Sequence, residues 1–445
     1  MASEIKSLVE IVKIKGGKRL PKGESLQTDE NKHPYIRVRD MGGRYIPKDG
    51  LEYVPENVFQ KISRYIVEEN DVIISIVGTV GLVSIIDKYF HKASQTENCA
   101  KLSGLSEVDA KYLYYYLISP CGQQEISTYT VGAVQPKLPL YGIESISVPW
   151  FKASKRAEIA HTLGSLDDKI ELNRQMNATL EAMAQALFKS WFIDFDPVID
   201  NALAAGNAIP DEFMERAEQR RDIETKDNSD IQNLFPNEFE CTEEMGWIPK
   251  GWGNGTLSDI CFFGKGKINT SELSLENYVS TENMNKEKAG ISYAASIAST
   301  NQVPKFSVGQ TLISNIRPYF KKIWLASFDG GRSNDVLGFQ ANNSAVNEYL
   351  FNLLYQDSFF DYMTATSKGT KMPRGDKAAI MSWSVAIPSS KLMEEFSELA
   401  KPMYLANNLR SLQTIELAKL RDTLLPKLMS GEIRIPDAAV WVEEI

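Results

Sequence analysis

The chain contains few of the residues that metal, redox and membrane chemistry require. Only 4 of its 445 residues are cysteine and 3 are histidine, and the cysteines form no CxxC pair. A zinc site or a disulfide framework is therefore not indicated. No run of 18 or more apolar residues occurs, and the N-terminus lacks the features of a signal peptide. We expect a cytoplasmic protein with free thiols and no membrane contact.

Motifs for catalysis are also scarce. There is no G-x-x-x-x-G-K-[ST] loop for an ATP motor, and no pair of carboxylates followed by Glu-x-Lys for a metal nuclease. Phe262–Gly266 fits the F-x-G-x-G loop of adenine methyltransferases, but polar, loop-like residues follow it where a helix is needed. Asn315–Phe320 imitates the N-P-P-Y tetrad with one residue too many. A self-contained DNA adenine methyltransferase and a structural coiled-coil adaptor are two functions that these motifs leave open.

The distribution of charge differs from its total. The net charge is −9, yet residues 196–245 contain 14 acidic and 4 basic side chains, so the rest of the chain is close to neutral. Residues 7–50 contain ten Lys and Arg against six Asp and Glu, and residues 305–332 are also basic. Local sign matters more than the total for binding a polyanion. The acidic excess is therefore compatible with DNA binding elsewhere in the chain.

The chain is duplicated. Residues 112–151 are similar to residues 349–388, about 237 residues downstream, and residues 8–20 are echoed by residues 257–269. A repeat of this length indicates two copies of one structural unit. Short β-branched runs, glycine turns and a few helices in each copy favour an α+β domain.

A long helical segment follows each copy. Apolar residues recur with 4,3 spacing from about Ser154 to Phe192, a helix of about 60 Å at 1.5 Å per residue. A helix this long needs a partner of similar length, which residues 392–429 provide; Pro402 and Pro426 are expected to break or kink its ends. The residues expected to pack the pair are Leu163, Leu166, Ile170, Leu180, Leu187, Met403, Leu409, Leu412 and Leu420.

These patterns predict an α+β fold with two similar globular domains separated by two long helices packed as an antiparallel coiled coil, a pseudo-two-fold dumbbell. The expected segments are a first domain 1–152, a first spacer helix 153–196, an acidic linker 197–252, a second domain 253–390, a second spacer helix 391–435 and a C-terminal tail 436–445.

Basic and amide side chains in glycine-punctuated loops are suited to DNA. Arg and Lys contact phosphates, and bidentate or adaptable side chains read base edges. Such loops occur at matching places in both copies, for example in 128–143 and 364–380. The candidate DNA-binding residues are Lys15, Lys18, Arg19, Arg37, Arg39, Thr79, Gln95, Thr96, Gln135, Lys137, Lys265, Lys267, Arg317, Lys321, Arg332, Asn334, Lys371 and Arg374.

Taken together, the duplicated domain, the helix LGSLDDKIELNRQMNATLEAMAQALFKSWFIDFDPV, the segment FPNEFE…GWIPKGW and the C-terminal LAKLRDTLLPKLMSGEIRI resemble the specificity (S) subunit of type I restriction–modification systems. The resemblance covers nearly the whole chain. It implies two target recognition domains that each read half of a split, asymmetric DNA sequence.

The resemblance also implies the division of labour. The helices would dock two methyltransferase (M) subunits, and restriction/motor (R) subunits would complete the complex. Methylation and cleavage would belong to these partners, so this chain would be non-catalytic. S-adenosylmethionine, ATP and Mg are accordingly expected only in the partner subunits, with none bound by this chain and no metal site.

Overall fold

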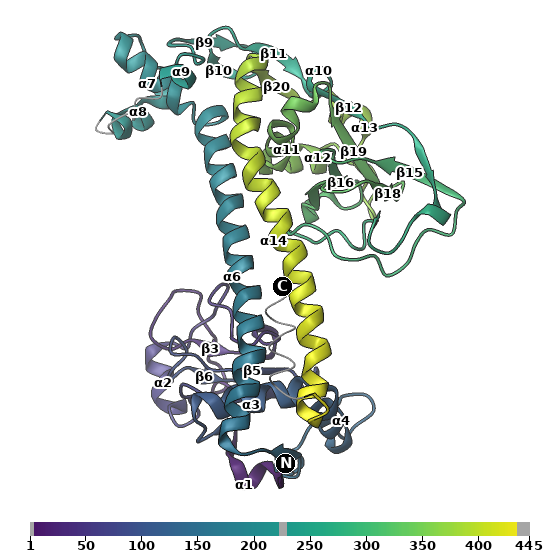
Figure 1. The fold of residues 1–445 in the computed structure, drawn as a ribbon. Helices are drawn as coiled ribbons and strands as arrows, with labels where there is room; N and C mark the ends of the chain where they lie inside the picture. Colours follow the sequence, from purple (N-terminus) through teal and green to yellow (C-terminus); the bar gives the residue numbers. More distant parts are fainter. Residues whose placement is uncertain (1–3, 222–228, 434–445) are drawn as a thin grey trace. The chain divides into compact units, whose positions relative to one another are not determined.

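The computed structural model describes residues 4–221 and 229–433, so the expected tail at 436–445 lies outside the described residues. The chain forms two compact units. Unit 1 comprises residues 1–174 and 412–445, and unit 2 comprises residues 175–411. Each unit contains one globular domain and a segment of each of two long helices, α6 (Ala153–Phe192) and α14 (Ser390–Ser430) (Figure 1). No helix in the described part of the chain is both long and apolar enough to cross a membrane.

The domain of unit 1 is built on a four-stranded antiparallel sheet with the order β2-β7-β4-β5. Strands β1 and β8 pair separately, and β3 and β6 form a short parallel pair. The elements in chain order are β1 (Glu4–Ser7), α1 (Leu8–Ile11), β2 (Lys13–Gly16), β3 (Tyr35–Ile36), η1 (Val38–Asp40), α2 (Glu56–Ile62), β4 (Val72–Ser75), β5 (Val83–Ile85), β6 (Ser94–Gln95), β7 (Cys99–Ser103), α3 (Glu107–Ile118), α4 (Pro120–Tyr129), α5 (Leu140–Glu144) and β8 (Ser147–Trp150).

The domain of unit 2 repeats this topology with the sheet order β12-β19-β16-β17, and β11 and β20 pair separately. A second sheet, β13-β15-β18-β14, enlarges the part that corresponds to β3 and β6. The elements are β11 (Gly253–Thr256), α10 (Leu257–Ile260), β12 (Cys261–Phe263), β13 (Lys267–Asn269), η3 (Thr270–Glu272), β14 (Tyr278–Val279), β15 (Gln302–Phe306), β16 (Thr311–Ser314), η4 (Pro318–Phe320), β17 (Ile323–Leu325), β18 (Gly330–Arg332), β19 (Val336–Ala341), η5 (Ser344–Val346), α11 (Asn347–Tyr355), α12 (Asp357–Ala365), α13 (Lys377–Met381) and β20 (Ser384–Ile387).

The register of the two sheets makes positions equivalent. Ser75 pairs with Cys99 as Ser314 pairs with Val336, so β4 corresponds to β16 and β7 to β19. Every residue of β4 and β16 is buried, as expected of apolar runs in the interior of a sheet. The predicted α+β fold with two similar domains is confirmed.

Local sequence explains the paired helices that follow each sheet. In unit 1, Ser106 caps α3 by accepting a hydrogen bond from the Asp109 backbone amide at 3.1 Å. Ser119 then caps α4, whose first residue is Pro120, a residue suited to the first helical turn. Tyr112 and Tyr115 of α3 are fully buried beneath the sheet and the long helices of this unit.

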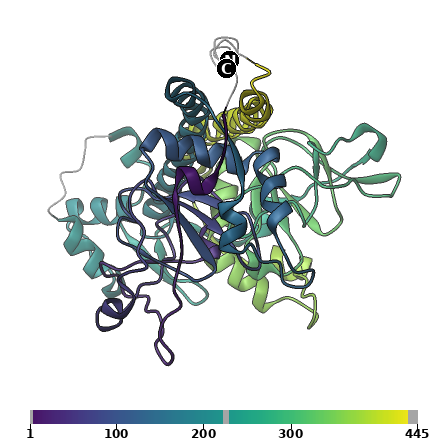
Figure 2. The ribbon, with the colours of Figure 1, turned by 90° about the horizontal axis from the view of Figure 1, so that it is seen from below.

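Within unit 1, the long helices pack through an apolar seam. Leu163, Leu166 and Ile170 of α6 share a buried core with Leu417 and Leu424 of α14. The half-buried Leu420 packs against the same core. Figure 2 views this unit from below, with the two helix segments at the margin of its domain.

Within unit 2, aromatic residues take the place of the leucine seam. Phe188 and Phe192 of α6 contact Phe396 of α14, with ring centroids 5.5 and 5.4 Å apart. Leu187 packs on this core, while Leu180 and Met403 are half-buried. The α14 helix continues through both Pro402 and Pro426, so the helix does not break at either proline.

The helix contacts are polar beside the boundary between the units. In unit 1, Asn173 donates a hydrogen bond to Gln413 at 3.0 Å. In unit 2, Asn177 donates one to Ser411 at 3.0 Å. Leu409 and Leu412, which we expected in the helix seam, are instead 66% and 49% exposed. The positions that face α6 here are taken by the polar residues Asn407, Ser411 and Gln413.

A buried polar triad joins domain and helices in unit 1. Tyr115 of α3 donates to Asp167 of α6 at 2.7 Å, and Arg421 of α14 pairs with the other oxygen of Asp167 at 2.8 Å. Although burial opposes it, the hydrogen bond to Asp167 raises the pKa of Arg421. The charged triad fixes the domain on both helix segments of its unit.

Unit 2 has a neutral triad at the corresponding place. Asn352 of α11 and Tyr404 of α14 lie 237 residues after Tyr115 and Asp167. The Asn352 side-chain oxygen accepts hydrogen bonds from Gln185 of α6 at 2.7 Å and from Tyr404 at 2.9 Å. The same three structural elements therefore meet through amide and hydroxyl groups in place of an ion pair.

The acidic segment between the domains is folded where the structure describes it. It contains α7 (Asp196–Ala205), η2 (Asp211–Phe213), α8 (Met214–Arg220), α9 (Ser229–Gln232) and the antiparallel pair β9 (Phe239–Thr242) and β10 (Gly246–Pro249). Bidentate ion pairs hold α8 to α7, with Arg216 bound to Asp196 and Arg220 to Asp200. Its charge is thus partly neutralised internally.

Candidate nucleic-acid interface

Three loops of unit 1 converge at one end of its sheet. We call them loop A (residues 76–82), loop B (residues 96–98) and loop C (residues 131–137), and together the loop cluster. The Ile76 amide donates to the Asn98 carbonyl at 2.8 Å, which joins A to B. The Gly78 amide donates to the Pro136 carbonyl at 3.1 Å, which joins A to C. The cluster is therefore held by backbone groups, and its side chains are free to vary.

Unit 2 contains the same loop cluster, formed by loops A (315–322), B (333–335) and C (368–374). The Asn315 amide donates to the Asp335 carbonyl at 2.7 Å, and the Arg317 amide donates to the Pro373 carbonyl at 2.8 Å. Loop C closes through paired bonds between Lys368 and Arg374, as it does between residues 131 and 137 in unit 1. The loop clusters of the two units are therefore held by equivalent backbone hydrogen bonds, although they lie hundreds of residues apart in the sequence.

Side chains differ at the equivalent positions. Arg317 corresponds to Gly78, because the amide of each donates to the equivalent proline carbonyl of loop C. Arg374 corresponds to Lys137, and Asp335 to Asn98. A common backbone with different hydrogen-bonding groups is the arrangement expected of two sites that read different base sequences.

Arg317 keeps the backbone conformation of the glycine that it replaces. Its φ is 52° and that of Gly78 is 78°, both in the left-handed region. A non-glycine residue there is strained by about 1–3 kcal/mol and persists where the surroundings enforce it, often at functional sites. The bond to Pro373 and the following Pro318, which opens η4, enforce it here.

The structure separates the sequence-predicted residues by exposure. Three of them are half-buried, namely Arg37, Arg317 and Lys321, and three are buried, namely Gln95, Thr96 and Arg332. The exposed ones are Lys15, Lys18, Arg19, Arg39, Thr79, Gln135, Lys137, Lys265, Lys267, Asn334, Lys371 and Arg374. Gln95, Thr96 and Arg332 are only 1%, 7% and 6% exposed, so their role in DNA binding stays a prediction and any contact would need a change at the surface.

The loop cluster gathers only some of these residues. Thr79, Gln135 and Lys137 belong to the cluster of unit 1. Arg317, Lys321, Asn334, Lys371 and Arg374 belong to that of unit 2. Lys18 and Arg19 lie beside loop B of unit 1, through a Lys18 amide bond to the Gln95 carbonyl at 2.9 Å and an Arg19–Glu97 ion pair at 2.5 Å.

Several predicted cations are already paired. Arg37 and Arg39 both bind Glu52, away from the cluster. Lys321 binds Asp357 at 2.9 Å, and Arg374 binds Asp335 at 3.2 Å. Hydrogen bonds from Lys288 and Lys321 lower the pKa of the Asp357 carboxyl. Replacing such a carboxylate partner by a DNA phosphate costs little free energy, since an exposed ion pair contributes about 0–1 kcal/mol to stability.

Sequence reasoning placed Lys305 in a basic stretch but not among the candidate residues, and it missed the buried pair of Lys101 and Asp71. Lys305 is exposed and lies over Gly266, where a Cβ atom would come within 2.6 Å of its Cε. Lys101 donates to Asp71 at 3.3 Å inside the sheet of unit 1. Gly266, which lies between two lysines, was the available signal for a basic site near Lys305. No local sequence pattern indicates the Lys101–Asp71 pair.

The methyltransferase-like loop does not have the geometry of a cofactor loop. Phe262–Gly266 connects β12 to β13, and β12 pairs antiparallel with β19. The loop therefore opens a strand, whereas an S-adenosylmethionine loop precedes a helix whose N-terminal amides face the ligand. No cluster of three or more metal-ligating side chains occurs in residues 4–221 and 229–433.

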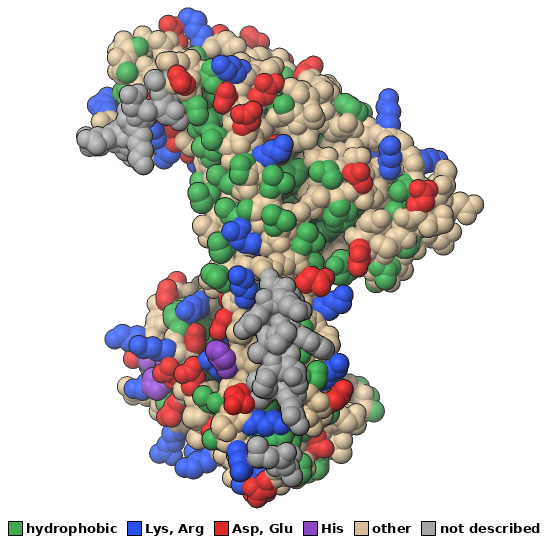
Figure 3. Space-filling model, in the orientation of Figure 1, with side chains coloured by type: hydrophobic (Ala, Val, Ile, Leu, Met, Phe, Trp, Pro, Cys, Tyr) green, Lys and Arg blue, Asp and Glu red, His purple; other side chains and the backbone are tan. Residues whose placement is uncertain are grey.

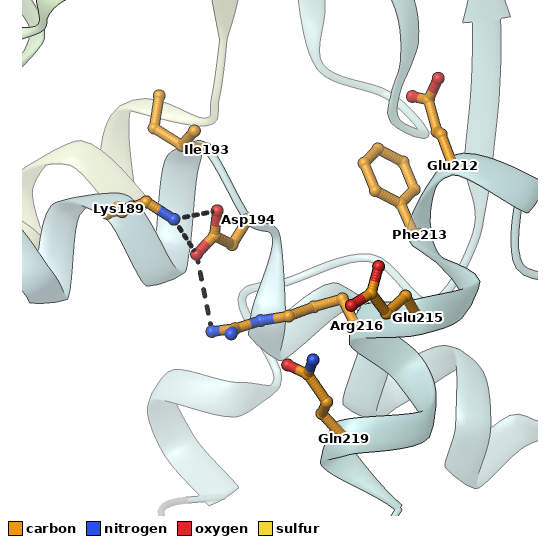
Figure 4. Close-up of a pocket in the computed structure, with 8 residues that line it drawn as sticks. All are labelled: Lys189, Ile193, Asp194, Glu212, Phe213, Glu215, Arg216 and Gln219. Carbon is orange, nitrogen blue, oxygen red and sulfur yellow. Dashed lines mark hydrogen bonds and ion pairs between the residues drawn. The ribbon is translucent and has the colours of Figure 1, made fainter.

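A hollow in unit 2 beside the acidic segment is lined by charged residues, of which Lys189, Asp194 and Arg216 interact with one another (Figure 4). Asp194 accepts a hydrogen bond from Lys189 at 2.5 Å and forms an ion pair with Arg216 at 3.5 Å. Although burial opposes it, the Arg216 hydrogen bond lowers the pKa of neighbouring Asp196. These ion pairs stabilise the segment.

Comparison with known proteins gives the class. Residues 2–182 match the family described as type I restriction modification DNA specificity domain. The chain is 23% identical over 449 residues to the type I restriction enzyme MjaIX specificity subunit of Methanocaldococcus jannaschii, covering 98% of this chain and 94% of that protein. It is 26% identical over 336 residues to the HindI specificity subunit of Haemophilus influenzae, covering 67% and 71%.

A solved structure shares the fold. The S subunit of a type I restriction–modification system from M. genitalium superposes with a TM-score of 0.57 at 16% identity, over 96% of this chain and 99% of that one. The resemblance found in the sequence is therefore confirmed: residues 2–182 match the type I DNA specificity domain, and the chain is similar to type I restriction specificity subunits over nearly its whole length.

Proposed function

We propose that this chain binds double-stranded DNA and recognises an asymmetric, two-part target. The domain of unit 1 reads one half and the domain of unit 2 the other. One observation carries the proposal: the loop cluster occurs twice with the same backbone bonds and different side chains. A shared scaffold with unlike reading groups gives two half-sites of different sequence.

The charge of the loop clusters supports contact with phosphates. Lys137 in unit 1 and Lys371 in unit 2 are exposed and form no ion pair with any residue in the described ranges. Each phosphate that a cation neutralises releases counterions, so binding through these loops should weaken as salt rises. Amide and carboxyl groups between the cations supply sequence discrimination.

We further propose that the long helices dock methyltransferase subunits, two per chain, and that restriction/motor subunits join the full complex. In unit 2, Met176 and Met183 of α6 and Leu405 and Leu409 of α14 are exposed. Figure 3 shows hydrophobic side chains gathered over these helix segments of unit 2. Apolar positions repeated at helical spacing on an exposed face favour a protein partner. S-adenosylmethionine, ATP and Mg would be bound by the partners.

Replacement of one domain tests this function. Residues 1–152 would be exchanged for the equivalent domain of another specificity subunit, and DNA methylation would be mapped in cells that contain the methyltransferase partner. The expected result is a change in one half of the modified sequence with the other half retained. The reciprocal exchange of residues 253–390 is the matched control. A change in both halves, or in neither, would contradict the proposal.

A further inference from the structure

A buried cation occupies the same place in both domains but has a counter-ion in only one. In unit 1, Lys101 of β7 donates to the Asp71 carboxylate at 3.3 Å and to the Ile66 carbonyl at 2.8 Å. Both side chains are nearly buried. The pair is a neutral unit inside the sheet, as buried charges require.

In unit 2 both partners are replaced. The strand register makes Gly338 equivalent to Lys101 and Gln310 equivalent to Asp71. The positive charge comes instead from Arg332 of β18, the position that Gln95 occupies in unit 1. A Cβ atom built on Gly338 would lie 2.9 Å from the Arg332 Nε atom, so this guanidinium fills the space of the lysine stem.

The Arg332 guanidinium has no anionic partner. Its Nη1 donates to the Val336 carbonyl and its Nη2 to the Gly264 carbonyl at 3.3 Å, while Nε has no hydrogen-bond partner. Only 6% of the residue is exposed, and no carboxylate within residues 4–221 and 229–433 forms an ion pair with it. Burial lowers the pKa of this guanidinium. An uncompensated buried charge is unfavourable, and it indicates a site where a ligand supplies the missing charge.

The surface above Arg332 is suited to an anion. The loop Gly264–Gly266, whose first carbonyl binds Arg332, carries Lys265 and leads directly to Lys267. Lys305 lies over Gly266. All three lysines are exposed, and none forms an ion pair with another described residue. The glycines leave the loop backbone open to close approach.

We propose that Arg332 and the loop around Lys265, Lys267 and Lys305 form a phosphate-binding site for the DNA backbone beside the second half-site. The lysines contact the phosphate, and Arg332 is a positioning residue that holds the loop through Gly264 and provides a fixed charge beneath it. This inference rests on the proposed function. It also distinguishes the domains, because the Lys101–Asp71 pair gives unit 1 no such uncompensated charge.

The test compares the full-length wild-type chain with Gln310→Glu and Arg332→Gln. Gln310→Glu restores the counter-ion that Asp71 provides in unit 1, and Gln219→Glu, on an exposed face of α8, is the control for net charge. Binding to duplex DNA of random sequence is measured at several salt concentrations. The slope of log Kobs against log salt should fall by about one for Gln310→Glu and Arg332→Gln and stay unchanged for Gln219→Glu.

A second readout is independent of DNA. Inorganic phosphate should raise the Tm of the wild-type chain more than chloride of equal ionic strength does, and Gln310→Glu should abolish that difference. Wild-type slopes and a wild-type phosphate effect in Gln310→Glu would overturn the inference while leaving DNA binding intact. A third outcome separates the two proposals. If Gln310→Glu abolishes the phosphate effect but the wild-type chain does not bind duplex DNA, the anion site is supported and the proposed function is contradicted.

Discussion

The two units solve the same structural problems with different polar chemistry. Domain and helices meet through Tyr115, Asp167 and Arg421 in unit 1, and through Asn352, Tyr404 and Gln185 in unit 2. The first triad contains an ion pair and the second contains only neutral groups. Backbone geometry is thus common to both units, while each junction has side chains that fit only their own partners.

This difference has an energetic consequence. A buried ion pair is sensitive to the loss of either partner, because the remaining charge is then uncompensated. A neutral network loses hydrogen bonds but leaves no charge behind. The two junctions should therefore respond differently to equivalent substitutions.

Asp167→Ala should destabilise unit 1 by about 3 kcal/mol, because Arg421 and the Tyr115 hydroxyl lose their buried acceptor. Thermal or urea unfolding of the full chain measures the change. Asp422→Ala is the matched control, since Asp422 binds the same arginine at 2.8 Å but is exposed. Its effect should stay below about 1 kcal/mol. Equal effects of the two substitutions would show that burial does not matter at this junction.

Asn352→Ala should destabilise unit 2 by about 2 kcal/mol, because Gln185 and Tyr404 each lose a buried acceptor. The same unfolding experiment applies. The double variant Asn352→Ala, Tyr404→Phe should lose little more than the single one, since both changes remove the same bond. Fully additive losses would contradict a shared network.

Acid should act on the charged parts of the molecule and leave the neutral triad unaffected. The folded-state pKa of Asp196 lies below the ordinary value of 3.8, chiefly because its Arg216 hydrogen bond outweighs burial. The stabilisation is therefore present above about pH 4 and is lost as pH falls through the folded pKa. Asp196→Asn should cost about 1 kcal/mol at pH 7 and flatten the acid limb of Tm against pH. An unchanged acid limb would argue against this pair.

Each unit has one buried and one exposed cysteine, which offers a mild probe of both cores. Burial raises the pKa of Cys99 and of Cys261 to about 12, whereas Cys121 and Cys241 are exposed. A thiol reagent at pH 8 should modify Cys121 and Cys241 within minutes and leave the other two intact, as mass spectrometry would show. Early labelling of Cys99 or Cys261 would mean that the sheet of that unit opens readily.

Much of the architecture could be predicted from the sequence. The repeat identifies two similar domains, and the proline-free heptads identify the first long helix. The heptad pattern misplaced Leu409 and Leu412 because Asn177 and Ser411 satisfy each other across the helices, and such pairing is visible only in three dimensions. Pro402 does not interrupt α14, because packing of the apolar face outweighs one lost backbone bond.

The candidate interface was predictable only in part. Glycine and lysine in 131–137 and 368–374 correctly indicated equivalent loops. The burial of Gln95 and Arg332 could not be inferred, because it depends on residues remote in sequence, such as Gly17 beside Gln95 and Gly264 beside Arg332. The replacement of an ion pair in unit 1 by a lone guanidinium in unit 2 likewise could not be inferred, because recognising it requires the strand register of both sheets.

The central claim is that one scaffold, used twice with unlike loop clusters, reads two different half-sites. Mapping of methylated adenines in the genome of a host that contains this chain and its methyltransferase partner tests it most directly. The account predicts a split motif with two halves of unequal sequence, and Arg374→Ala in loop C of unit 2 should relax only one half. A single continuous motif, or two identical halves, would contradict it.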